Sequence, residues 1–141
     1  MKKKYFPIIL ITVAFFLILT LNAKPTYLLE NKNIDKIVIS NVYDADFSII
    51  IDNENNINQL VKPFDKYNLK RNKAESIDSI MQYKIELYEN NILVVTIELN
   101  LLDKESDWAY NVCRIFSIDE HKYYKLPDDF IKEITNYVNS H

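Results

Sequence analysis

Glycine is absent from this sequence of 141 residues, where ordinary usage would supply about ten. Phosphate-cradling loops, dinucleotide-binding turns and nucleophile elbows need glycine, because the backbone there approaches a ligand closely or adopts positive φ. Nucleotide-binding and acyl-transfer enzymes of those designs are therefore not expected. Turns must be made by asparagine and aspartate, which tolerate the left-handed region better than other residues.

Cysteine occurs once, at Cys113. An intrachain disulfide is therefore impossible, and no cysteine follows the N-terminal apolar run to accept a lipid. Cys113 lies in Trp108–Ile118, a stretch with the residue types of a β-strand. We expect a buried, unreactive thiol there, because a nucleophilic thiol needs a nearby base and a lowered pKa.

Histidine is almost as rare, with only His121 and His141 present. A histidine-rich zinc site is therefore excluded. His121 follows two acids, Asp119 and Glu120, and the three residues indicate a polar turn more than an acid–base cluster.

Two acidic segments have the spacing of acids that begins a calcium-binding loop. The segment from Asp103 to Asp107 has Trp108 where the loop needs its turn-forming glycine and Arg114 where it needs a bidentate glutamate. The segment from Asp52 to Asn56 fails at the same two positions. No metal and no cofactor are expected.

The N-terminus has an export pattern. Three lysines at positions 2–4 precede Tyr5–Leu21, a run without a charged residue. The lysines are expected to stay cytoplasmic, which places the rest of the chain at the outer face of the cytoplasmic membrane or in the medium. Ala23 offers a small residue for cleavage, but Leu21 fits poorly two positions earlier. Both a retained anchor and a cleaved signal peptide stay open.

We therefore divide the chain into a signal peptide or signal anchor (1–23), a tether (24–33) and an extracytoplasmic domain (34–141). If the segment is uncleaved, residues 5–21 contact the membrane. Without the three N-terminal lysines, the chain carries 14 basic and 20 acidic side chains, which gives a net charge of −6. An acidic domain is a poor ligand for nucleic acid, so none is expected as a partner.

The first half of the domain reads as two strands and a helix. Ile34–Ser40 and Ala45–Ile51 predict paired strands. Asp52 or Asn53 can cap a helix that Pro63 kinks or ends. Its apolar residues recur at helical spacing: Ile57, Leu60, Val61 and Phe64. Residues 66–78 are polar and carry three basic side chains, which favours a mobile loop over a basic recognition site.

The second half begins with the clearest element of the sequence, a hairpin. Met81–Leu87 and Leu93–Leu99 alternate apolar and polar residues around an Asn90–Asn91 turn, which predicts the centre of a sheet. Further strands are expected within Trp108–Ile118 and His121–Leu126. Pro127 and two aspartates then open a terminal helix. Its apolar side carries Phe130, Ile131, Ile134, Tyr137 and Val138.

These elements predict an α+β fold with the order ββα-βββ(β)-α. Hairpin connections favour a largely antiparallel sheet, and two amphipathic helices are expected to cover one face of it. The other face would remain in water.

Aromatic residues supply the candidate binding surface. On an open sheet face, such rings offer large, rigid contact area. The candidates are Tyr88, Trp108, Tyr110, Tyr123 and Tyr124. The alternative is that these rings fill the core or pair across strands.

Several segments together resemble the YhfM-like exported domains of Gram-positive bacteria. They are the strands Ile34–Ser40 and Ala45–Ile51, the helix around Ile57–Val61, the Tyr83–Ile85 strand and the helix start at Leu126–Phe130. The resemblance implies a small exported domain and assigns no activity to it.

The sequence favours a non-enzymatic protein of the bacterial cell envelope that binds another macromolecule, an envelope protein or a wall polymer. A surface-tethered inhibitor or immunity protein is one version of this function. The alternative from another class is a small carboxylate-dependent hydrolase, which would need two close acids in a pocket.

Overall fold

The computed structural model describes residues 27–69, 71–74, 81–100, 112–116 and 119–141. The expected signal segment and its apolar run lie outside these ranges. Within them, no helix combines the length and apolar character that crossing a membrane requires.

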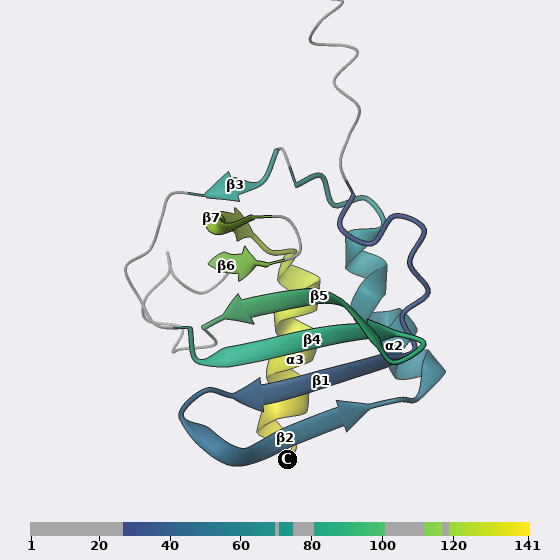
Figure 1. Cartoon of the computed structure of the whole chain (residues 1–141), viewed down its shortest axis with the longest axis vertical. Coiled ribbons are helices and arrows are strands. Elements are labelled where there is room, and N and C mark those ends of the chain that lie inside the picture. Colours follow the sequence, from purple (N-terminus) through teal and green to yellow (C-terminus); the bar gives the residue numbers. More distant parts are fainter. Residues whose placement is uncertain (1–26, 70, 75–80, 101–111, 117–118) are drawn as a thin grey trace, which may run out of the picture.

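The described residues form one seven-stranded sheet in the order β2-β1-β4-β5-β6-β7-β3, and every neighbouring pair is antiparallel. Helices α2 and α3 lie behind the sheet in Figure 1, so they cover one of its faces. The strands are β1 (Lys36–Asn41), β2 (Asp44–Ile51), β3 (Lys73–Ala74), β4 (Tyr83–Glu89), β5 (Ile92–Leu99), β6 (Val112–Ile115) and β7 (Asp119–Lys125). The expected antiparallel α+β architecture is confirmed.

The predicted hairpin forms β4 and β5 at the middle of the sheet. Asn90 and Asn91 both adopt positive φ, 52° and 64°, as a two-residue turn between twisted strands requires. Without glycine, asparagine takes this role because its side chain tolerates the left-handed region. The alternation places Ile85, Leu87 and Ile97 on the helix side, each 0% exposed.

The two helices begin where the sequence indicates. Asn53 caps α2 (Glu54–Val61), and its side-chain oxygen accepts hydrogen bonds from the backbone N–H of Asn55 and Asn56 at 3.0 and 3.3 Å. Pro63 lies in the short 3-10 helix η1 (Lys62–Phe64) that follows. Pro127 precedes α3 (Asp128–Asn139), whose first turn holds two aspartates. The helices present their predicted apolar residues to the sheet.

Three expectations need correction. Residues 66–78 are not simply a loop, because β3 pairs there with Tyr123 and Tyr124 of β7. Asp119, Glu120 and His121 begin β7 instead of forming a turn. The packed domain also begins before Ile34, since Leu28 is 6% exposed within the core. In each case the local sequence is typical of a loop or linker, but a contact with residues distant in the sequence places the segment in a strand or in the core.

Of the expected strand Trp108–Ile118, the structure shows Val112–Ile115, and Phe116 continues in a turn. Residues 108–111 and 117–118 lie outside the described residues.

Candidate functional site

The open face of the sheet is the side that the helices leave uncovered. We define it by nine half-buried residues on the strands: Val38, Ser40, Lys84, Glu86, Tyr88, Thr96, Glu98, Arg114 and Tyr123. Their sequence neighbours on β4 and β5 point into the core. Because side chains alternate between faces along a strand, these nine residues share one surface.

One row of this face runs across five strands. The pairing partners are Ser40 with Lys84, Lys84 with Glu98, Glu98 with Arg114, and Arg114 with Tyr123. Side chains that lie opposite each other in an antiparallel pair are about 5 Å apart at Cβ, so the row is continuous. It brings together residues from positions 40 to 123.

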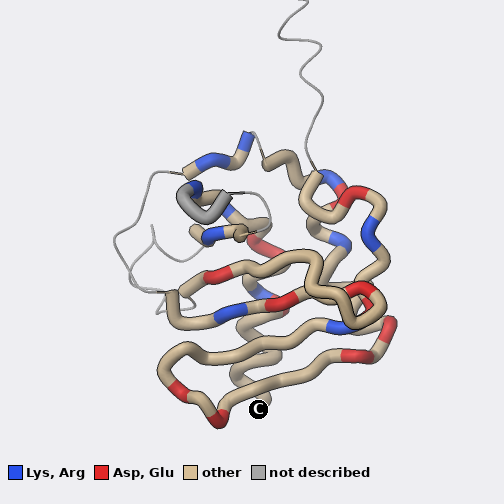
Figure 2. The backbone as a smooth tube through the Cα atoms, in the orientation of Figure 1, with Lys and Arg blue, Asp and Glu red and all other residues tan. Residues whose placement is uncertain are grey.

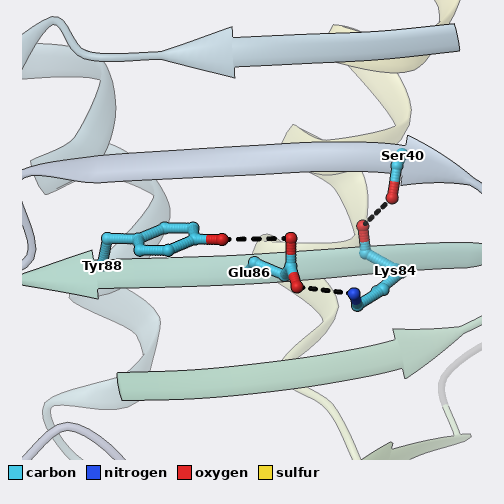
Figure 3. A network of polar contacts seen from close by, with 4 residues as sticks. All are labelled: Ser40, Lys84, Glu86 and Tyr88. Atoms are coloured by element: carbon cyan, nitrogen blue, oxygen red, sulfur yellow. Dashed lines mark hydrogen bonds and ion pairs between the residues drawn. The ribbon is translucent and has the colours of Figure 1, made fainter. Parts of the chain in front are cut away.

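A polar network fixes the β4 part of the open face (Figure 3). Lys84 Nζ lies 2.5 Å from Glu86 Oε1, and the Tyr88 hydroxyl donates to Glu86 Oε2 at 3.2 Å. The Ser40 hydroxyl approaches the Lys84 carbonyl oxygen at 3.5 Å. Because Glu86 is only 17% exposed, its two contacts restrict both the carboxylate and the tyrosine ring.

The surroundings of Tyr88 affect the pKa of its hydroxyl. Partial burial raises the pKa of the Tyr88 hydroxyl above its ordinary value, and the negative charge and hydrogen bond of Glu86 add to the rise, while Lys84 opposes it. Lys36 Nζ lies 4.5 Å from the centroid of the Tyr88 ring and donates to Asn91 Oδ1 at 3.0 Å. The ring therefore has a cation on its face and a carboxylate at its hydroxyl.

Arg114 and Glu98 form the second charged pair of the open face. One Arg114 nitrogen, Nη2, donates to Glu98 Oε2 at 2.7 Å, and the guanidinium carbon lies 5.7 Å from the Phe116 ring centroid. Arg114 Nε is buried without a hydrogen-bond partner among the described residues. The side chain is still 29% exposed, so part of a charged, aromatic-flanked surface faces solvent.

The charges of the face balance. Figure 2 shows a basic position followed by acidic ones along β4 and a single acidic position on β5. Lys84 and Arg114 oppose Glu86 and Glu98 in the two close pairs. Fixed, neutral patterns of this kind favour specific complementary contacts over general attraction to charged polymers.

The five aromatic candidates separate into three groups. Tyr88 and Tyr123 are half-buried and lie on the open face. Tyr124 is 2% exposed and pairs with Cys113 on the helix side, so its placement in a binding surface is wrong. Trp108 and Tyr110 lie outside the described residues. Among the described residues, two of the five candidate rings therefore lie on the open face, and they are at different ends of it.

Sequence reasoning missed Lys84, Glu98 and Arg114. The alternation of β4 and β5 indicated that Lys84 and Glu98 face away from the core. The proximity of Arg114 to Glu98 could not be predicted, because it depends on the register of β6 against β5.

Cys113 is 0% exposed on the helix side, as expected, and burial raises the pKa of its thiol well above the ordinary value. The neighbouring Tyr67 hydroxyl donates to the Lys125 carbonyl oxygen, and burial likewise raises the pKa of Tyr67. Protonated, buried groups of this kind are parts of the core and not nucleophiles.

A loss of stability at alkaline pH is expected from Cys113. Above its ordinary pKa of 9.0 the thiol ionises in the unfolded chain while the folded chain keeps its proton, so the free energy of unfolding falls with rising pH. One such group contributes a slope of about 1.4 kcal/mol per pH unit. Urea unfolding at pH 8, 9 and 10 measures it. Cys113→Ala should fall less steeply than the unsubstituted chain, and equal slopes would contradict a raised thiol pKa.

The helix side has a depression of about 500 Å³ between the α2–η1 segment and α3. It is lined by Gln59, Lys62, Pro63, Asp65, Lys66, Asp129, Lys132 and Glu133. Its carboxylates stand among three lysines, and Asp65 and Asp129 are exposed. Across the described ranges, no three His, Cys, Asp or Glu side chains are grouped to hold a metal.

Comparisons with protein families, curated proteins and solved structures gave no match to this chain.

Proposed function

We propose that this chain is an exported protein of the bacterial cell envelope whose open sheet face binds another macromolecule. Inhibitor or immunity proteins of this kind act by occupying a partner surface. The supporting observation is the open face, on which two ion pairs and a hydrogen-bonded tyrosine are held by neighbouring strands of the sheet. A prearranged surface loses little side-chain entropy on binding.

The small hydrolase is the weaker alternative. A depression that it could use lies between α2 and α3, where Asp65 and Asp129 are exposed to solvent. The binding function is therefore the one that we develop.

The export part of the proposal is supported by the three lysines before Tyr5–Leu21. Membrane retention and secretion both agree with it. Fractionation of cells into cytoplasm, membrane and medium, followed by immunoblotting, tests this part independently of binding. Recovery in the cytoplasm alone would refute export.

Removing the two rings of the open face should abolish most of the capture of a partner. Buried interface aromatics contribute about 2 kcal/mol or more each, so Tyr88→Ala with Tyr123→Ala should reduce capture by tenfold or more. The measurement is an affinity pull-down from solubilised envelope with the tagged full-length chain. The partner is identified with the unsubstituted chain and then quantified with each variant.

The matched control is Asn58→Ala with Gln59→Ala, two exposed positions of α2 on the other side of the sheet. These substitutions should leave capture unchanged. Capture that survives the tyrosine substitutions in a folded chain, or that is lost with the α2 substitutions, would contradict binding by the open face.

A further inference from the structure

The tip of the β4–β5 hairpin exposes two consecutive aliphatic side chains. Ile92 is 69% and Leu93 is 47% exposed, and Ile92 is the most exposed large apolar side chain in the described part of the chain. The turn does not need them, because Asn90 and Asn91 make it. The core does not use them either, since the buried residues of β5 begin at Val95. Two adjacent aliphatics in water therefore require another explanation.

The tip stands beside the start of the described domain. Leu28 and Lys32 line a depression of about 530 Å³ together with residues 89, 90 and 92–95 of the hairpin. In Figure 1 the segment that leads into β1 lies at the same end of the strands as the β4–β5 turn. The hairpin tip and the N-terminal side of the domain are therefore close in space.

The chain before this point limits how far the tip can lie from a membrane. The apolar run ends at Leu21, and only residues 22–26 separate it from Tyr27, which pairs with Asn68 of the domain. Five residues span at most about 17 Å when fully extended. If the run is retained in the membrane, the depression beside Leu28 is held close to the bilayer surface.

Charged side chains of both signs lie around the hairpin tip. Glu89 accepts a hydrogen bond from the backbone N–H of Asn33 at 2.9 Å, and Asp35 accepts one from the backbone N–H of Asn90 at 2.6 Å. Both carboxylates are therefore engaged by the backbone. Lys32 lines the depression, where an ammonium group can remain at the level of lipid headgroups.

We propose that Ile92 and Leu93 insert into the outer surface of the bilayer that holds the N-terminal segment, so that the hairpin tip forms a second membrane contact. Partition of apolar side chains at the headgroup boundary, about 5–10 Å deep, drives the contact. The tether keeps the tip at high local concentration, which makes a weak contact effective. This inference rests on the retained-anchor form of the proposed function.

The contact would also orient the domain. The hairpin tip lies at one end of β4 and β5, so insertion there turns that end of the sheet toward the membrane. The open face then stands at an angle to the bilayer and remains accessible to a partner.

The test uses the full-length chain in vesicles of phosphatidylglycerol and phosphatidylethanolamine. An environment-sensitive dye is attached to Ile92→Cys or, as the matched control, to Ile50→Cys on β2. Ile50 is 64% exposed and belongs to the strand at the far edge of the sheet. Cys113 is 0% exposed, so the unsubstituted chain serves as the blank for labelling.

The dye at position 92 should be quenched several times more strongly by nitroxide-labelled lipid than the dye at position 50. Adding Leu93→Asp to the labelled Ile92→Cys chain should remove most of that difference. Equal quenching at the two positions, in a chain that floats with the vesicles, would overturn the inference and leave the anchor intact. A chain that does not float with the vesicles would overturn both the anchor and the contact.

Discussion

Phe130→Ala is expected to lower the free energy of unfolding by about 3–5 kcal/mol, the largest single effect that we predict. Phe130 is 1% exposed at the start of α3, and its ring centroid lies 4.7 Å from that of Phe64 in an edge-to-face arrangement. Phe64 also contacts Tyr67, with centroids 5.6 Å apart. Removing the Phe130 ring therefore leaves a cavity where the two helical segments meet.

Urea unfolding followed by circular dichroism measures the effect. The matched control is Asn136→Ala, an exposed position on the same helix, which should change stability by about 0.5 kcal/mol or less. A loss below about 1 kcal/mol for Phe130→Ala would mean that α3 does not pack on the core as described.

Ile85→Ala is expected to cost about 2–5 kcal/mol, because it deletes buried methyl groups from the central strand. Ile85 is 0% exposed and lies between Ile39 of β1 and Ile97 of β5, which are also 0% exposed. Both neighbouring strands, β1 and β5, are also paired with a further strand on their other side. They therefore have little freedom to move inward and fill the cavity.

The control for this prediction is Ile50→Ala, which removes the same atoms from a side chain that is 64% exposed. It should change stability by about 0.5 kcal/mol or less. If the two substitutions cost the same, the assignment of Ile85 to the helix side of the sheet would be wrong.

Elements defined by local pattern were predictable from the sequence. The hairpin was visible because alternation and the Asn90–Asn91 turn act within a few residues. The start of α2 was visible because the cap residue bonds to its own helix. The order of the strands in the sheet was not predicted, because β1 pairs with β4 and the helix α2 lies between them in the chain.

Elements defined by distant pairing were not predictable. β3 is two residues long, and it is a strand only because Lys73 and Ala74 pair with β7, about fifty residues later in the chain. Tyr123 and Tyr124 are adjacent and chemically identical, so pattern alone cannot say which ring is buried. The pairing of Cys113 with Tyr124 decides it.

The candidate site divides in the same way. Tyr88 was identified by its place in an alternating strand, whereas the Arg114–Glu98 pair depends on the register between β5 and β6. A register change of one residue would reverse which side chains of β6 reach the open face. Such information is not contained in composition or spacing.

Photo-crosslinking in living cells is the most direct test of binding by the open face. A photoreactive amino acid replaces Thr96 at the middle of the open face or, as control, Gln59 on exposed α2. We predict a discrete adduct with an envelope component from position 96 and none from position 59. An adduct from position 59 alone, or no adduct from position 96 in a folded and exported chain, would contradict the proposed function.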